Sequence, residues 1–253
     1  MCWEITLSGD PDDLDSLCQS LNEGLVKLLR QGKQFLLSSD ELNAIEDVQA
    51  ARALAVRLIE QISGAARHCI QSCTPIRFAG LARRRPDGSR QIFLFAESII
   101  CTSTAGPITV VLRHADGSEE VHRSADAVRE LLEIARHDRN VATVLSLQSE
   151  GKTDWVNLFR IYEVVEDDCQ GQMGIQRRRW ASRNETSLFC QTAQSRGAIG
   201  NEARHAKETK PPPVNPMSHD HAKTLIARIV DAWLQSKRSE SRPPPAAAAA
   251  QDE

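Results

Sequence analysis

The side chains best suited to chemistry in this sequence gather between residues 154 and 205. Arg204 and His205 are adjacent near the end of that segment. A neutral imidazole can accept a proton at pH 7, and a guanidinium can hold a phosphate or an oxyanion. Glu163 and Asp167 lie four residues apart earlier in the segment, so both carboxylates fall on one side of a helix. If the protein is an enzyme, we expect these four residues to be catalytic.

A second set of polar side chains in the same segment is suited to contacting a ligand or a phosphate. The set is Arg160, Arg177, Arg178, Arg179, Trp180 and Asn201. A basic triplet beside an aromatic ring can grip phosphates while the ring stacks on a base. Alternatively, the triplet neutralises Glu166 and Asp168 at the end of the preceding helix, where the helix dipole disfavours negative charge by about 0.3–1 kcal/mol. The sequence leaves both readings open, and RNA is a candidate partner that it does not favour.

Motifs for metals, cofactors and covalent catalysis are missing from the chain. The seven cysteines are an odd number and include no CxxC pair, which is typical of reduced thiols in a cytoplasmic protein. No P-loop, GxGxxG or GxSxG pattern occurs. We therefore expect no bound cofactor and no metal site. A metal-dependent hydrolase built on Glu163 and Asp167 is the weaker alternative.

The composition is that of a folded protein, with 253 residues of which 41% are hydrophobic and 26% charged. The formal net charge of −3 argues against a general nucleic-acid coat or a polybasic membrane binder. Positive charge is nevertheless local, because residues 176–210 carry eight basic and three acidic side chains. The sequence contains no apolar run of about 18 residues, so no membrane span is predicted. The oligomeric state is left open.

The first half of the chain has the pattern of an antiparallel sheet with a covering helix. Strands are predicted over 2–7 and 33–37, and a helix from Asp10 or Asp12 carries an apolar stripe as far as Leu28 and Leu29. The longest predicted helix covers 41–69. A meander of about three strands follows, over 76–83, 91–101 and 108–113. These elements predict an α+β domain over residues 1–122.

The second half has helical periodicity and no convincing strand. Helices are predicted over 124–136, from Asp138 to 147, and over 154–169, 183–194 and 219–236. They predict an all-α bundle domain over residues 123–236. The Ser-, Pro- and Ala-rich stretch 237–253 is predicted to be a disordered tail.

Two segments of the helical half resemble the HEPN superfamily, whose helical bundles are common in RNA-cleaving toxins and antiviral proteins. The acidic amphipathic helix from Trp155 to Asp168 is one, and Asn201-x-x-Arg204-His205 ahead of the final helix is the other. The similarity covers about residues 150–236. That superfamily places an arginine four to six residues before its catalytic histidine, and none of the seven histidines here has one. The resemblance thus implies a HEPN-like bundle whose role is binding or regulation.

Two hypotheses follow for the function. The first is a binding or regulatory protein in which the cluster between 154 and 205 is a structural network or a ligand site. The second is a metal-independent ribonuclease of the toxin or defence type, in which Arg204 and His205 act on RNA and Glu163 or Asp167 orients the imidazole. The sequence does not decide whether the protein is an enzyme.

Overall fold

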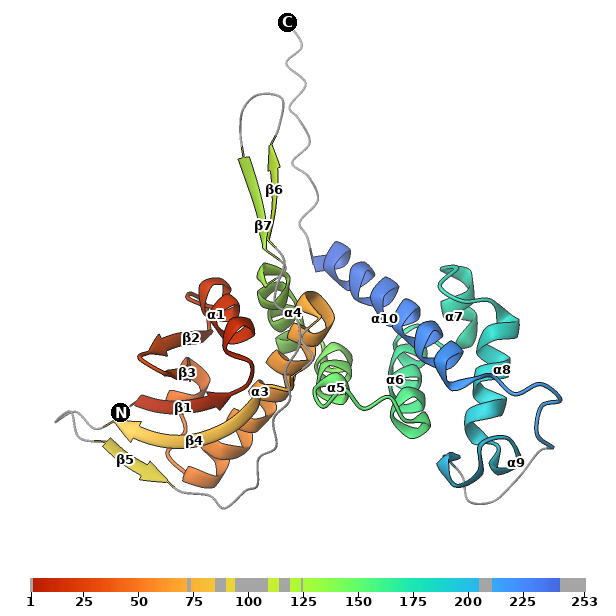
Figure 1. Cartoon of the computed structure of the whole chain (residues 1–253), viewed down its shortest axis with the longest axis horizontal. Coiled ribbons are helices and arrows are strands. Elements are labelled where there is room, and N and C mark those ends of the chain that lie inside the picture. Colours follow the sequence, from red (N-terminus) through yellow and green to blue (C-terminus); the bar gives the residue numbers. More distant parts are fainter. Residues whose placement is uncertain are drawn as a thin grey trace, which may run out of the picture. The chain divides into compact units, whose positions relative to one another are not determined.

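The computed structural model describes residues 2–71, 74–84, 90–93, 109–113, 119–123, 125–204 and 211–241 (Figure 1). The chain divides into two compact units, residues 1–161 and 162–253, which we call the first unit and the helical unit. The division falls after the predicted boundary at 122, because the two helices that follow residue 125 pack on the long helix of the first unit.

A five-stranded antiparallel sheet forms the centre of the first unit. Its strands are β1 (Cys2–Ser8), β2 (Val26–Gln31), β3 (Gln34–Ser39), β4 (Arg77–Arg84) and β5 (Arg90–Phe93), in the order β2-β3-β1-β4-β5. Central β1 pairs with β3 and β4, with Ile5 opposite both Leu37 and Leu81. Alternate side chains of β1, namely Trp3, Ile5 and Leu7, are buried, so one face of the sheet lies against the core.

The helices that contact this sheet are α1 (Pro11–Ser20), α2 (Asp40–Asn43) and α3 (Val48–Ile70), whereas α4 (Asp126–His137) and α5 (Arg139–Gln148) pack on α3. The longest, α3, packs against β4, α4 and α5. It lies close to α5 at Gly64, where an added Cβ would lie 1.9 Å from the carbonyl oxygen of Leu145. Only glycine permits that contact between the two helix backbones.

A separate two-stranded sheet pairs β6 (Thr109–Arg113) with β7 (Glu119–Arg123), with Val111 opposite Val121. The prediction that 108–113 belongs to the same meander as 76–83 is therefore wrong, since β6 pairs with β7 instead. Of the predicted strand 91–101, residues 94–101 lie outside the described residues.

The helical unit contains α7 (Gln172–Arg177), α8 (Arg183–Gln194), α9 (Arg196–Ile199), the 3-10 turn η1 (Gly200–Glu202) and α10 (His219–Ser241). The division between the two units falls within the helix α6 (Trp155–Asp168), after residue 161. The α+β class, with an antiparallel sheet first and mostly helices afterwards, is confirmed. No helix among the described residues is both long and apolar enough to cross a membrane.

Three predicted boundaries are corrected by local interactions. The first helix ends at Ser20 instead of continuing to Leu29, because Gly24 takes a φ of +99° and the chain turns back to form β2. The long helix begins at Val48 instead of 41, because the Asp47 side chain accepts a hydrogen bond from the amide of Ala50.

The third correction concerns the C-terminal tail, which was predicted to begin at 237. The last helix extends to Ser241, and residues 242–253 lie outside the described residues. Lys237 is held by the Asp168 carboxylate, which explains why the helix continues beyond the predicted end.

Candidate functional site

The acidic helix α6 positions the candidate carboxylates of the helical unit. Its apolar side is buried as predicted, through Trp155, Leu158, Phe159, Tyr162 and Val165. Glu163 and Glu166 are half-buried and Asp167 is exposed. The carboxylates therefore line the polar side of a helix whose other side is fixed by packing.

Glu163 forms an ion pair with Arg204, so the structure brings together two of the four predicted catalytic residues. The amide of Arg204 also donates to the carbonyl of Ala193, at an N···O distance of 3.0 Å, which ties this segment to α8. Both charged side chains are about one-third exposed, at 33% for Arg204 and 38% for Glu163. His205 lies outside the described residues, so its predicted contact with Glu163 stays a prediction.

Tyr162, which directly precedes Glu163 in the sequence, is fully buried. Its ring packs on that of Phe189, with the ring centroids 5.3 Å apart. The nearby Gln172 donates from Nε2 to the Sγ of Cys190 at 3.5 Å. Burial raises the pKa of Cys190 to about 11, and burial followed by the charge of Glu163 raises the pKa of Glu166. The thiol is therefore protonated at neutral pH and is no activated nucleophile.

Asp168, at the end of α6, belongs to a third interaction. Its carboxylate accepts from the Trp233 Nε1 at 2.8 Å and from the Lys237 Nζ at 2.9 Å. Asp168 is only 16% exposed and Lys237 15%. Lys237 on α10 thus supplies positive charge to Asp168, and neutralisation of Glu166 and Asp168 by the arginine triplet stays a prediction.

A third ion pair joins α8 to α10. The Arg228 Nη2 bonds the Glu185 carboxylate at 2.6 Å, while its Nε donates to the carbonyl of Trp180 at 3.1 Å. Glu185 also closes a capping box with Ser182 at the start of α8. These bonds lower the pKa of Glu185 to about 2, with the Arg228 bond as the largest cause.

The remaining predicted contact residues are distributed over the chain. Arg160 is exposed on α6, one helical turn before Glu163. Asn201 accepts a bond from the Arg196 Nη2 at 3.3 Å. Asp167 projects from the exposed side of α6. In the part of the chain that the structure describes, no three His, Cys, Asp or Glu side chains group as a metal ion requires.

The arginine triplet lies where α7 ends, in a turn that resembles a Schellman motif. The amide of Trp180 donates to the carbonyl of Ile175 at 3.2 Å, and that of Arg179 to Gln176 at 2.9 Å. Arg179 takes a φ of 59°, in the left-handed region where glycine is usual. An arginine is thus held in a backbone conformation that costs a non-glycine residue about 1–2 kcal/mol.

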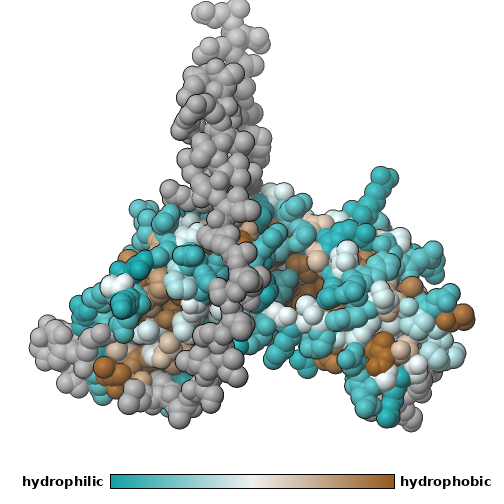
Figure 2. All heavy atoms as spheres, in the orientation of Figure 1, coloured by the Kyte–Doolittle hydropathy of each residue, from teal (hydrophilic) through white to brown (hydrophobic). Residues whose placement is uncertain are grey.

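Arg177, Arg178, Arg179 and Trp180 form, together with Arg183 at the first turn of α8, a surface that we call the basic corner. The Arg178 guanidinium lies over the Trp180 ring, 5.5 Å from its centroid. Figure 2 shows hydrophilic side chains projecting from the part of the molecule that α7 occupies. Among the described residues, Arg177, Arg179 and Arg183 are exposed and have no ion pair with a carboxylate.

The basic corner differs from Arg204, Lys223, Arg228 and Lys237 of the same unit, each of which pairs with a carboxylate. It is therefore the part of the predicted site that keeps free positive charge next to an aromatic ring. Sequence reasoning missed Arg183, although Ser182-x-x-Glu185 is a capping-box signal that would have placed it in the first turn of a helix.

Comparison of this chain with protein-family models, with curated proteins and with solved structures gives no match.

Proposed function

We propose that the helical unit is a binding module for single-stranded RNA, and that the basic corner is its contact surface. The observation that carries this proposal is the set of exposed arginines without a carboxylate partner around Trp180. Guanidinium groups contact successive phosphates, while a half-exposed ring can stack on a base. The contact is sequence-tolerant, because phosphate contacts position a strand without reading its bases.

Two features of the corner support an RNA surface over a purely structural role. The carbonyl of Trp180 is fixed by Arg228, so the ring is presented from an ordered backbone. Arg179 holds a left-handed conformation although glycine would be less strained there. Strain of this kind persists where a side chain is retained for another reason.

The pair of Glu163 and Arg204 has a structural role in this proposal. Each charge already has its partner, and the segment at Arg204 is bonded to α8. The helical unit is then a HEPN-like bundle that binds RNA and does not cleave it. The protein would act in the cytoplasm as a binding or regulatory protein.

The proposal is tested by fluorescence anisotropy of a short labelled oligouridylate titrated with the full chain. The double variant Arg177→Ser/Arg183→Ser should weaken binding about tenfold or more, since each phosphate contact contributes on the order of 1 kcal/mol. Its matched control is Lys223→Ser/Arg196→Ser, which removes two positive charges from the same unit. The slope of log K against log salt should fall by about 1.4 for the test variant, at about 0.7 for each phosphate contact.

Equal weakening by the test and control variants would overturn the proposal, as would absence of binding at low salt. The same samples decide between binding and cleavage. RNA that stays intact supports a binding module. Cleavage that persists in a chelator and is lost in Arg204→Ala would instead support the metal-independent ribonuclease, with Arg204 and the adjacent His205 as its reacting groups.

A further inference from the structure

A polar groove in the first unit is lined by residues that do not belong to the candidate site. It measures about 730 Å³ and is formed by α3, α4 and α5. Its polar lining includes Arg57, Glu60, Arg136, His137, Arg139 and Thr143. Small-molecule sites typically measure about 300–1,000 Å³ and contain a few convergent polar groups.

The packing of the helices explains where this groove opens. The backbones of α3 and α5 come close together at Gly64, against the carbonyl of Leu145. Long side chains replace the small ones in the preceding turns of α3, where Glu60 and Arg57 line the groove. Ser146 of α5 also lines the groove, and its hydroxyl partly offsets the rise that burial causes in the pKa of Glu60.

Two arginines in the groove carry positive charge that the fold does not neutralise. Arg57 on α3 and Arg139 on α5 are exposed, and neither forms an ion pair with a carboxylate of the described residues. Arg136 differs, because it bonds Glu41 at 2.9 Å and lies 3.7 Å from Glu133. The two guanidinium groups thus belong to different helices and face one groove.

The rest of the lining adds further hydrogen-bonding groups. Glu60 is half-buried, and burial raises the pKa of its carboxyl group. Thr143 and Ser146 add hydroxyl groups. The lining therefore combines two cations able to hold a phosphate with a carboxyl group and hydroxyls able to bond the hydroxyl groups of a sugar.

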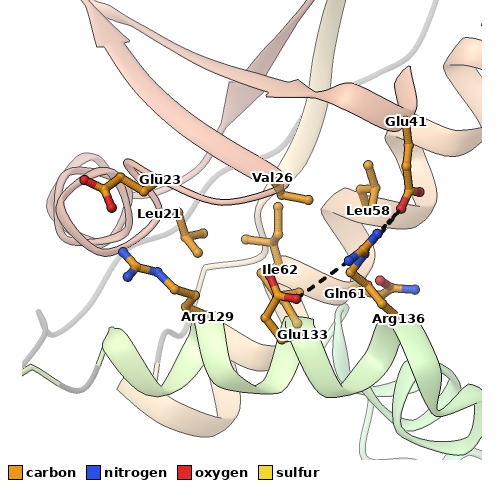
Figure 3. A pocket seen from close by; sticks show the side chains of 11 residues that line it. Leu21, Glu23, Val26, Glu41, Leu58, Gln61, Ile62, Arg129, Glu133 and Arg136 are labelled. Atoms are coloured by element: carbon orange, nitrogen blue, oxygen red, sulfur yellow. Dashed lines mark hydrogen bonds and ion pairs between the residues drawn. The ribbon is translucent and has the colours of Figure 1, made fainter. Parts of the chain in front are cut away.

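A small apolar pocket lies beside the groove (Figure 3). It measures about 20 Å³, room for little more than one water molecule. Leu21, Val26 and Ile62 line it, and it shares Arg136 and Glu41 with the groove. In Figure 3 Arg136 reaches toward both Glu41 and Glu133, so the charge of Arg136 is neutralised within the fold and differs in this from Arg57 and Arg139.

We propose that this groove binds a phosphorylated small molecule that carries hydroxyl groups, such as a mononucleotide or a sugar phosphate. Arg57 and Arg139 hold the phosphate. Glu60 and the hydroxyls of α5 bond the sugar. The site is separate from the RNA surface and would add a small-molecule signal to a binding protein.

Isothermal titration of the full chain with four probes tests the proposal: adenosine monophosphate, ribose 5-phosphate, inorganic phosphate and adenosine. Both phosphate esters should bind, inorganic phosphate should bind more weakly, and adenosine should give no heat. The variant Arg57→Gln/Arg139→Gln should bind the esters at least about tenfold more weakly, because it removes both guanidinium groups that contact the phosphate. Lys33→Gln, which removes an exposed cation of the same unit, should change nothing.

The nucleotide and the sugar phosphate are told apart by their relative affinities. Tighter binding of adenosine monophosphate identifies a nucleotide site, and equal affinities identify a sugar-phosphate site. The proposal is overturned if neither ester binds, if adenosine binds as tightly as its phosphate, or if Lys33→Gln weakens binding as much as the double variant. The RNA proposal is independent of this result, because Arg177→Ser/Arg183→Ser should leave these titrations unchanged.

Discussion

Replacing Arg179 by glycine separates stability from RNA binding at one position. Arg179 has a φ of 59° after α7, and its amide bonds Gln176. Glycine removes a backbone strain of about 1–2 kcal/mol, but it adds about 0.5–1 kcal/mol of conformational entropy to the unfolded chain. The expected net effect of Arg179→Gly is a stabilisation of about 0.5–1 kcal/mol. The loss of one phosphate contact should at the same time weaken RNA binding by about threefold to tenfold.

A matched control exists at the end of α6. Gln170 has a φ of 62°, and its amide bonds Asp167 while that of Gly171 bonds Glu166. Gln170→Gly therefore changes the same helix-end motif without removing a positive charge. It should give the same stabilisation and leave RNA affinity unchanged.

Urea denaturation followed by far-ultraviolet circular dichroism measures the stability of both variants, and fluorescence anisotropy measures RNA affinity. The reasoning on strain is refuted if Arg179→Gly lowers the free energy of unfolding. The reasoning on function is refuted if Arg179→Gly is more stable and still binds RNA like the unchanged protein. A loss of RNA affinity in Gln170→Gly would also contradict it, since that residue carries no charge.

Three further outcomes follow from the packing and the ion pairs. Gly64→Ala should destabilise the first unit by about 3 kcal/mol, since its Cβ would meet a backbone carbonyl of α5 at 1.9 Å; a change below about 1 kcal/mol in urea denaturation would contradict this. Asp168→Ala should lower the free energy of unfolding by about 3 kcal/mol, because it leaves the mostly buried Lys237 without its counter-charge and removes the acceptor of Trp233 Nε1. An unchanged midpoint of thermal unfolding would show that these contacts do not stabilise the fold. The pKa of Glu185 is lowered from 4.5 to about 2, so its contribution is complete above about pH 4.5 and is lost as the pH falls through about 2. Because the side chain is partly exposed, the difference in stability from Glu185→Gln should be at most about 1 kcal/mol at pH 7 and should vanish near pH 2.

The class of fold was predictable because local signals dominate its main elements. Asp138 caps α5 through bonds to two amides, and residues 183–194 form the helix that their periodicity indicates. The apolar stripe that continues through Leu28 and Leu29 led to the wrong prediction of a helix there, because apolar residues at spacings of three and four fit a helix. Pairing of these residues with β3 decides otherwise, and such pairing depends on residues distant in sequence.

The candidate site was predictable only in part, for the same physical reason. Complementary charges on α6 and at Arg204 made their pairing a reasonable expectation, but spacing could not show which acid is involved. The partner of Asp168 comes from α10, far along the chain, and no local pattern indicates it. The groove of the first unit depends on three helices that meet only in the folded chain, so its arginines had no common signal.

The edge strand β2 has a consequence for how copies of this chain behave at high concentration. Among the described strands β2 pairs with β3 alone, so part of its other edge has backbone groups able to accept a strand from a second molecule, while the amide of Leu28 already donates to the carbonyl of Leu21. Lys27 is exposed on this strand, close to Leu29, which is 51% exposed, whereas Arg30 pairs with Asp15 of α1. The charge of Lys27 repels a second copy aligned along the same edge. Replacing Lys27 with threonine would therefore promote strand addition and aggregation while leaving the fold of each molecule unchanged.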